Sequence, residues 1–304
     1  MTHLTPTTNS IEIRRLHWHF KKKQPVLRGV DLALPVGSVT ALLGKNGAGK
    51  TTLMRALTGG LPFPRGTVSV LGRDPWRERV AVLRSIGHVA DQTELPRWMK
   101  VREHWDLLAP FYPGWEMSEA RRLAERLGVD PDARYHDLSR GGKELACLVA
   151  ALAHKPKLLL LDEPFSGLDV LARRRVFDAL LELLREDGRS ALLASHSLAD
   201  VERCADRIAV LHEGRISLCG EIEELRRGAT RLAVELEGDS PSWTPPLPAK
   251  VERREGRELV LYTLRDAESL QDQLAHDPAV KHVEPVERDL EDLVAAALGE
   301  VAPS

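Results

Sequence analysis

Cysteines are few in this chain and form no metal-binding or disulfide pattern. Its 304 residues include only Cys147, Cys204 and Cys219, and no two of these form a CxxC pair. An odd number of scattered cysteines argues against a disulfide framework and against a structural zinc site. We interpret them as small core residues of a protein that works in a reducing compartment.

Long apolar runs and an excess of one charge are also missing. Apolar stretches such as residues 158–161 are far too short to span a bilayer, which takes about 20 residues. Residues 1–10 are polar, so we expect no secretory signal. Lys and Arg number 43 against 45 Asp and Glu, a net charge of −2, which disfavours nucleic acid as the main partner. We therefore expect a cytoplasmic chain whose membrane role, if it has one, depends on a partner.

The alternation of strand-like and helix-like segments predicts the fold class. From residue 11 to about 225, short apolar runs alternate with helical patterns, which predicts an α/β fold with a mainly parallel sheet. Helical spacing dominates residues 95–155, where we expect an inserted helical subdomain. A Pro-rich loop around Pro245 precedes a strand-like run at 258–263 and a helical run at 268–276. The predicted domains are 11–227 and a small α+β lobe at 228–304.

A glycine-rich segment carries the strongest chemical signal. Residues 44–51 fit the pattern G-x-x-x-x-G-K-[ST] and lie between a strand-like run at 38–43 and a helical run at 50–57. Such glycines let backbone N–H groups turn onto phosphate oxygens, while the lysine neutralises the β- and γ-phosphates and the following hydroxyl coordinates Mg²⁺. The sequence therefore predicts a P-loop that binds ATP. Its expected contacts are Gly44, Asn46, Gly47, Ala48, Gly49, Lys50, Thr51 and Thr52.

Two neighbouring carboxylates follow an apolar strand. Residues 158–161 are all leucine and are followed by Asp162 and Glu163. Because side chains alternate along a strand, the two carboxylates should face opposite ways and have different roles. Asp162 is placed to hold hydrated Mg²⁺ together with Thr51, and Glu163 to orient and deprotonate the attacking water.

His196 and Ser139 begin two further candidate sites. His196 follows a strand-like run at 190–195, at the edge where ligands of open α/β sheets gather, although a histidine satisfied in the core is the alternative. Residues 137–144 precede a helical run that continues to residue 153, so the Ser139 hydroxyl lies at a helix N-terminus. This position predicts a second anion site, and simple helix capping by Ser139 is the alternative.

Together these motifs resemble the ATP-binding cassette (ABC) family. The phosphate loop, Gln92, the 138–144 segment, the Asp-Glu pair, residues 166–169 and His196 occur in the order of that family, over residues 11 to about 225. The chain is most similar to ATP-binding subunits of exporters. The resemblance implies a Mg²⁺-dependent ATPase.

The resemblance also assigns roles to residues that spacing alone does not. It implies that Gln92 touches Mg²⁺ and senses a transmembrane partner. Ser139 and Gly141 are expected to bind the γ-phosphate held by the opposite subunit, and Asp169 to line the dimer seam. His196 is expected to grip the γ-phosphate and position the water.

The partners implied by the resemblance are a separate transmembrane permease and a second ATPase subunit, in a homodimer or a heterodimer. The expected location is the inner face of the cell membrane, and no direct contact with nucleic acid is expected. A soluble ABC ATPase that acts on ribosomes or DNA is the alternative function. Such proteins usually carry two cassettes or long coiled-coil insertions, and the sequence has neither.

Two assignments stay open at this point. Phe20 is the expected adenine-stacking residue, with Trp18 and His19 close enough to compete. Arg140 stands where the family usually has the first glycine of its signature, and Gly142 takes the usual glutamine position. The Arg140 charge either adds to the γ-phosphate site or faces solvent.

A cluster of large apolar residues follows Gln92 in a chain with only 5% aromatic residues. It forms either a docking groove for a partner or the core of the helical subdomain. Its members are Trp98, Met99, Trp105, Phe111, Tyr112 and Trp115.

Overall fold

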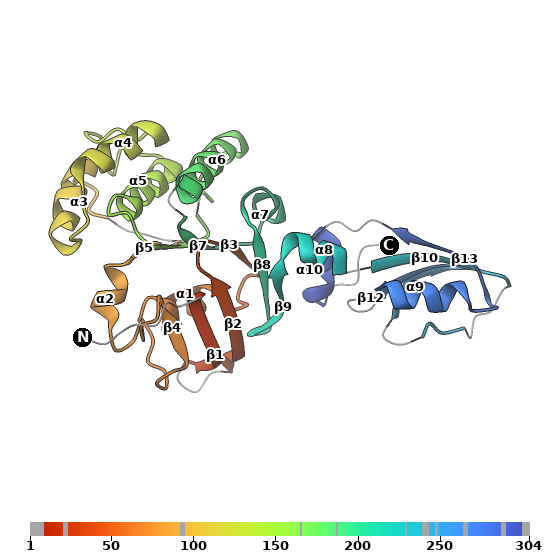
Figure 1. Cartoon of the computed structure of the whole chain (residues 1–304). Coiled ribbons are helices and arrows are strands. Elements are labelled where there is room, and N and C mark those ends of the chain that lie inside the picture. Colours follow the sequence, from red (N-terminus) through yellow and green to blue (C-terminus); the bar gives the residue numbers. More distant parts are fainter. Residues whose placement is uncertain are drawn as a thin grey trace. The chain divides into compact units, whose positions relative to one another are not determined.

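The chain folds as two units, Met1–Cys219 and Gly220–Ser304 (Figure 1). The computed structural model describes residues 9–20, 24–91, 95–164, 166–186, 188–228, 230–238, 243–246, 249–263, 267–286 and 290–299. The boundary between the units precedes helix α8 (Ile222–Gly228), whereas the sequence places the domain boundary at the end of that helix.

A six-stranded sheet forms the middle of the first unit. Its strand order is β5-β6-β7-β3-β8-β9, and the pairs β5–β6, β6–β7, β7–β3 and β3–β8 are parallel. The prediction of an α/β fold with a mainly parallel sheet is therefore confirmed. The strands are β3 (Val39–Leu43), β5 (Ile86–Val89), β6 (Leu158–Asp162), β7 (Ser190–Ser195), β8 (Arg207–His212) and β9 (Arg215–Glu221).

Both faces of this sheet are covered, which explains why its strands are apolar throughout. Leu159 and Leu161 of β6 belong to one buried cluster, and Leu158 and Leu160 to another. The split follows the alternation of side chains along a strand. Asp162 continues the second set, so the alternation directs it to the face that packs against helix α1 (Lys50–Leu57).

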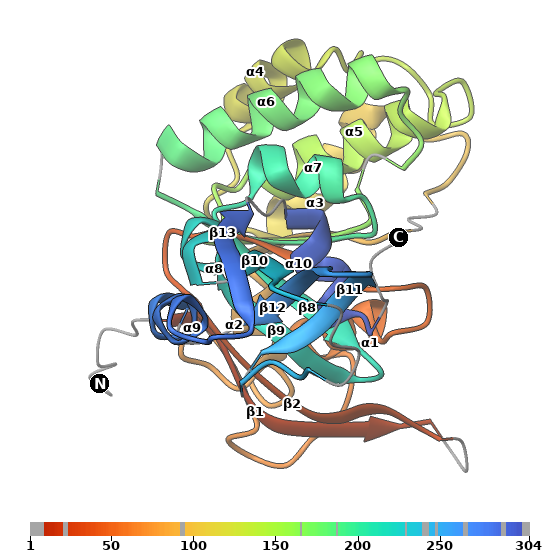
Figure 2. The same ribbon diagram turned by 90° about the vertical axis from the view of Figure 1, so that its right-hand side faces the viewer.

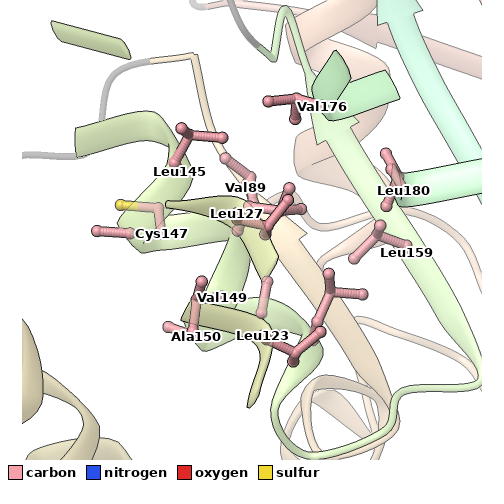
Figure 3. Packing of buried hydrophobic residues seen from close by; sticks show 14 of the residues in the cluster. Val89, Leu123, Leu127, Leu145, Cys147, Val149, Ala150, Leu159, Val176 and Leu180 are labelled. Carbon is pink, nitrogen blue, oxygen red and sulfur yellow. The ribbon is translucent and has the colours of Figure 1, made fainter. Parts of the chain in front are cut away.

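A layer of helices covers the first face (Figures 1 and 2). Residues 101–152 form helices throughout much of their length, as the sequence predicts for the helical subdomain. Figure 3 shows Leu123, Leu127 and Val149 of these helices packed in one cluster with Leu159 of the sheet. The helices of the layer are α3 (Val101–Leu108), the short 3₁₀ helix η1 (Ala109–Phe111), α4 (Met117–Leu127), α5 (Arg140–Leu152), α6 (Val170–Glu186) and α7 (Leu198–Cys204).

The second face packs against α1 and an antiparallel sheet of order β2-β1-β4. Ile11 and Ile13 of β1 and Leu32 and Leu34 of β2 are buried in that cluster. The sequence patterns do not predict this separate sheet. Its strands are β1 (Asn9–His19), β2 (Pro25–Pro35) and β4 (Val68–Val70), and helix α2 (Arg79–Leu83) lies between β4 and β5 in the chain.

The second unit has its own core and mixes strands with helices, as predicted. Its antiparallel sheet has the order β11-β12-β10-β13. Leu232, Leu261 and Leu270 are among the residues buried between this sheet and helix α9. The elements after α8 are β10 (Thr230–Leu236), β11 (Lys250–Glu255), β12 (Glu258–Thr263), α9 (Ala267–Ala275), β13 (Val280–Val286) and α10 (Leu290–Ala297). Across the described ranges of both units, no helix is long and apolar enough to cross a bilayer.

Candidate functional site

The glycine-rich motif forms the connection from β3 to α1. A Cβ atom on Gly44 would lie 2.6 Å from the Leu211 carbonyl oxygen, so a larger residue would collide with β8. Gly49 caps α1 with a φ of 112°, in the left-handed region that favours glycine. Asn46 and Gly47 lie exposed beside this turn. The loop therefore leaves the positive end of the α1 dipole accessible to an anion.

Lys50 lies at the start of α1 with only 7% of its side chain exposed. Its Nζ donates to the Gly44 carbonyl oxygen at 2.7 Å and lies 3.2 Å from Glu163 Oε1. Thr51 is exposed beside it, and Thr52 is buried. A buried ammonium group needs a negative partner, and Glu163 supplies one in this structure.

Asp162 provides an oxygen ligand that suits a divalent cation. It is 3% exposed, and burial raises the pKa of its carboxyl against the opposing effect of a hydrogen bond with the Thr51 side chain. Among the described residues, Asp162 Oδ1 has no hydrogen-bond partner. Mg²⁺ prefers one or two protein oxygens of this kind, completed by water and phosphate oxygens. Asp162 and Thr51 therefore fit the magnesium ion that the sequence predicts.

Glu163 lies between two cationic or hydrogen-bonding side chains. Its Oε2 is 2.7 Å from His196 Nδ1, and its Oε1 faces Lys50. The Glu163 backbone has a φ of 49°, a left-handed conformation that persists only where its surroundings impose it, and its N–H donates to the Ala194 carbonyl oxygen at 3.0 Å. The His196 side chain is 64% exposed, so the alternative of a core histidine is wrong. Because β6, β7 and β3 are neighbours in the sheet, their carboxyl ends bring these groups together.

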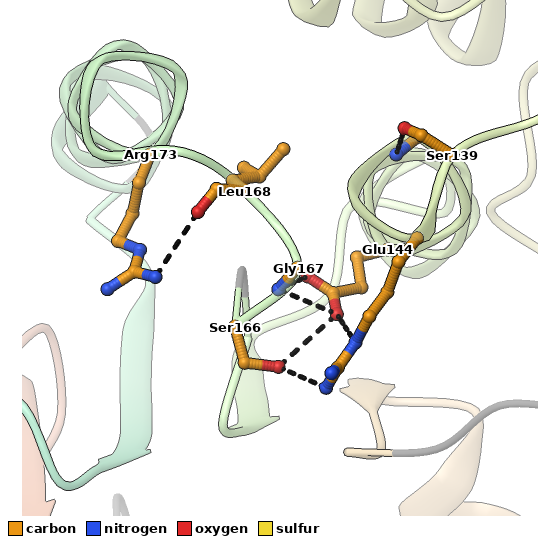
Figure 4. Close-up of polar contacts among 8 residues, drawn as sticks. Ser139, Glu144, Ser166, Gly167, Leu168 and Arg173 are labelled. Carbon is orange, nitrogen blue, oxygen red and sulfur yellow. Dashed lines mark hydrogen bonds and ion pairs between the residues drawn. The ribbon is translucent and has the colours of Figure 1, made fainter.

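Ser139 caps helix α5. Its Oγ accepts a hydrogen bond from the Gly142 N–H at 3.0 Å (Figure 4), so the capping role is present. Ser139 is exposed, and within the described part of the chain no hydrogen bond joins it or Gly141 to the phosphate loop. A Cβ atom on Gly141 would lie 2.2 Å from Leu168 Cδ2, so this turn packs directly on residues 167–168.

Arg140 and Asp169 have defined contacts in the same region. The Arg140 guanidinium donates to Ser166 Oγ at 2.6 Å and to Glu144 Oε1 at 3.2 Å. The Arg140 side chain is 64% exposed, so it faces solvent, as one of the two alternatives has it, and its charge is also paired with Glu144. Asp169 Oδ1 accepts from the Ala172 N–H at 2.9 Å and so caps the first turn of α6.

Comparisons with known proteins decide the family. The sequence profile of the ABC transporter family matches residues 27–166. The aliphatic sulfonates import ATP-binding protein SsuB of Pseudomonas entomophila is 36% identical over 243 residues, which cover 75% of this chain and 86% of that protein. The chain belongs to the ABC transporter family. The bacitracin transport ATP-binding protein BcrA of Enterococcus faecalis is 34% identical over 206 residues, 66% of each chain. A solved ATP-binding subunit of an ABC transporter matches with a TM-score of 0.64 and 29% identity, over 71% of this chain and 92% of that one.

Membership of the ABC transporter family implies ATP binding and hydrolysis. The structure groups Lys50, Thr51, Asp162, Glu163 and His196 at one edge of the parallel sheet. Ser139, Gly141 and Asp169 lie at the N-terminal ends of two helices instead. Gln92 lies outside the described residues.

The three aromatic candidates for adenine stacking differ in exposure. Trp18 packs against the core of the antiparallel sheet, whereas His19 is exposed and Phe20 is 37% exposed. Phe20 makes an edge-to-face contact with Trp18, with ring centroids 6.1 Å apart. Phe20 therefore has ring surface available for a base, and its position is fixed by Trp18.

The aromatic cluster after Gln92 divides between core and surface. Trp105 is fully buried and Met99 nearly so. Trp98 and Phe111 are 67% and 61% exposed. Trp105 and Met99 therefore belong to the core of the helical subdomain, whereas docking of a partner on Trp98 and Phe111 stays a prediction.

Sequence reasoning missed the role of Glu144, whose carboxylate accepts a hydrogen bond from the Gly167 N–H at 3.1 Å. Its spacing of four residues from Arg140 on one helix was a readable signal of an ion pair. The bond to a backbone amide had no such signal, because every residue but proline carries that donor.

Proposed function

We propose that the chain is a Mg²⁺-dependent ATPase subunit that works as a pair of copies and drives a separate membrane-spanning permease in export. The strongest support is the Glu163 carboxylate, which lies between Lys50 and His196 beside the phosphate loop. A positioned carboxylate supplies the base that water attack on a phosphate requires. In this proposal residues 11–227 form the ATPase domain and residues 228–304 an accessory domain.

Lys50 and Glu163 exchange partners when ATP binds. Lys50 Nζ turns its charge to the β- and γ-phosphates, because their oxygens carry more negative charge than one carboxylate. Glu163 Oε1 is then released to accept a proton from the attacking water. His196 Nδ1 stays hydrogen-bonded to Oε2 and so keeps the plane of the carboxylate in place. The exposed His196 ring, held beside Glu163, is the group that this proposal assigns to the γ-phosphate.

Thr51 and Asp162, with Gln92, would hold Mg²⁺. That ion supplies neutralisation of charge across the β- and γ-phosphates. Asp162 must be ionised for this role, and its Oδ1, which has no hydrogen-bond partner among the residues that the structure describes, would be the oxygen that holds the ion.

A second copy completes each site in this proposal. Ser139 and Gly141 begin a helix of 13 residues whose positive end has an exposed serine and no bond, within the described ranges, to the phosphate loop of its own chain. Two-fold pairing of copies, or of this chain with a related one, would place that helix end against the γ-phosphate of the opposite site. Asp169 would then line the seam.

The permease would dock on the exposed aromatic residues of the helical layer. Trp98 and Phe111, which are 67% and 61% exposed, offer large aromatic surface for such a contact. This contact would hold the subunit at the inner face of the membrane. We propose export because Arg140 is a basic residue in the 138–144 segment, a feature of exporter-like subunits. The relative SsuB, in contrast, is named as an import protein.

Phosphate release by the purified chain tests the proposed ATPase. Lys50→Ala should abolish most ATP binding and turnover, and Lys157→Ala, a change at an exposed lysine before β6, should leave both unchanged. Unchanged ATP affinity in Lys50→Ala would contradict the assignment of the phosphate-binding site.

The direction of transport is tested in inverted membrane vesicles that contain the chain and its permease, with bacitracin as the first probe because of the BcrA likeness. ATP-dependent accumulation supports export, and accumulation in right-side-out vesicles contradicts it.

A further inference from the structure

Four residues near the start of α5 form a closed set of polar contacts (Figure 4). Glu144 accepts from Arg140 Nε at 3.2 Å, from Ser166 Oγ at 3.3 Å and from the Gly167 N–H, which lies 3.2 and 3.1 Å from its two oxygens. Arg140 donates to the same Ser166 hydroxyl at 2.6 Å. We call Arg140, Glu144, Ser166 and Gly167 the clamp.

Close packing accompanies these hydrogen bonds. A Cβ atom on Gly167 would lie 2.5 Å from Arg140 Cγ, so the arginine stem lies directly on the glycine. On the other side of the clamp, the contact between Gly141 and Leu168 is equally tight. The start of α5 and residues 166–168 therefore cannot shift against each other without breaking contacts.

Glu144 contributes most of the strength of the clamp. An exposed ion pair one helical turn apart is worth little, and the Arg140 side chain is 64% exposed. The Glu144 side chain is only 13% exposed, and its carboxylate satisfies a backbone amide and a hydroxyl as well as the guanidinium. Loss of this carboxylate leaves a partly buried amide without its acceptor, which is the costly way to lose a hydrogen bond.

The clamp joins two segments that serve different ATP sites under the proposed function. Residues 166–168 follow shortly after Glu163, the base for the ATP of the same chain. Ser139 and Gly141 begin the helix that serves the ATP of the opposite copy. We propose that Arg140 and Glu144 are positioning residues that fix these two segments to each other, so that ATP bound at one site sets the geometry of the other. The proposal rests on the proposed function and explains why an arginine can replace the usual glycine at residue 140.

Glu144→Met in the full-length chain tests the clamp, because methionine keeps the length of the side chain but has no oxygen to accept from the Gly167 N–H and the Ser166 hydroxyl. We expect kcat to fall about ten- to a hundredfold, as for a small misplacement away from the chemistry, and the Hill coefficient for ATP to fall towards one. The affinity for ADP, measured with a fluorescent analogue, should stay as in the wild type. Glu116→Met is the matched control, since Glu116 forms a surface ion pair with Lys155 at 3.1 Å. Wild-type kcat and Hill coefficient in Glu144→Met would overturn the proposal.

A double-mutant cycle at Gly167 and Arg140 gives an independent test of the clamp. The φ of Gly167 lies outside the left-handed region, so alanine is compatible with its backbone, and the three atoms nearest to the added Cβ would all belong to the Arg140 stem. Gly167→Ala should lower kcat in the wild type but add no further loss in an Arg140→Gly background. Losses that add in the double variant would overturn the proposal. A wild-type chain that binds ADP but releases no phosphate would instead refute the proposed function.

Discussion

Replacement of Glu163 by glutamine should separate ATP binding from hydrolysis. The change removes the base, so turnover should fall by a factor on the order of hundreds or more. It also removes the charge that faces Lys50 across 3.2 Å. At an effective dielectric constant of about 20, that attraction is roughly 5 kcal/mol before desolvation, which offsets most of it. ATP no longer has to displace the carboxylate from Lys50, so its binding free energy should become more favourable by about 1 to 2 kcal/mol. That gain corresponds to about tenfold tighter binding.

Two assays on the same preparations check this prediction. Phosphate release under saturating Mg-ATP gives the turnover, and titration with a non-hydrolysable ATP analogue gives the affinity. Glu78→Gln is a suitable control, because Glu78 pairs with Arg73 on the surface at 2.8 Å. Normal phosphate release from Glu163→Gln would remove Glu163 from the mechanism. Weaker analogue binding would show that Glu163 supports the nucleotide site instead of competing for Lys50.

Three further predictions concern stability and assembly. Burial raises the pKa of Asp162, so its ionised form destabilises the fold at neutral pH. Asp162→Asn should therefore raise the midpoint of thermal unfolding, although Mg-ATP hydrolysis is lost. This gain in the midpoint should shrink as the pH falls, because the wild-type carboxyl then takes up its proton. Trp105→Ala should lower the unfolding free energy by about 3 to 5 kcal/mol in a denaturant titration, whereas Trp98→Ala should change it by less than about 0.5 kcal/mol and reduce co-purification of the permease. Deletion of residues after Arg227 should leave ADP binding intact in a fluorescence titration, and loss of binding would contradict the separation of the domains.

The parallel sheet and its site could be predicted because their signals are local. The helix predicted at residues 50–57 coincides with α1, since the glycine turn fixes its start. The antiparallel sheet was not predicted, because its first strand breaks the alternation of apolar and polar residues. Arg14 and Arg15 are both exposed in β1, the register shifts between Ile13 and Leu16, and Arg15 has a φ of 46°. A bulge of this kind hides a strand from pattern analysis.

Contacts within the site were predictable only in part. The types and order of Asp162, Glu163 and His196 follow from what phosphate chemistry requires, so sequence reasoning could select them. The present pairing of Glu163 with Lys50 could not be foreseen, because it depends on the left-handed Glu163 backbone and its bond to the Ala194 carbonyl oxygen. Such geometry comes from tertiary packing and has no residue pattern of its own.

In the proposed pair, each ATP site is built from two copies of the chain. Phosphate release from a mixture of Lys50→Ala and Ser139→Arg chains tests it directly, because each variant alone has both of its shared sites damaged. In a mixed pair, the intact phosphate loop of the Ser139→Arg chain faces the intact Ser139 of the other chain. We predict that mixing raises phosphate release clearly above the sum of the two separate rates. A mixture that releases phosphate only at that sum would contradict this shared arrangement, since it would place Lys50 and Ser139 in a site within one chain.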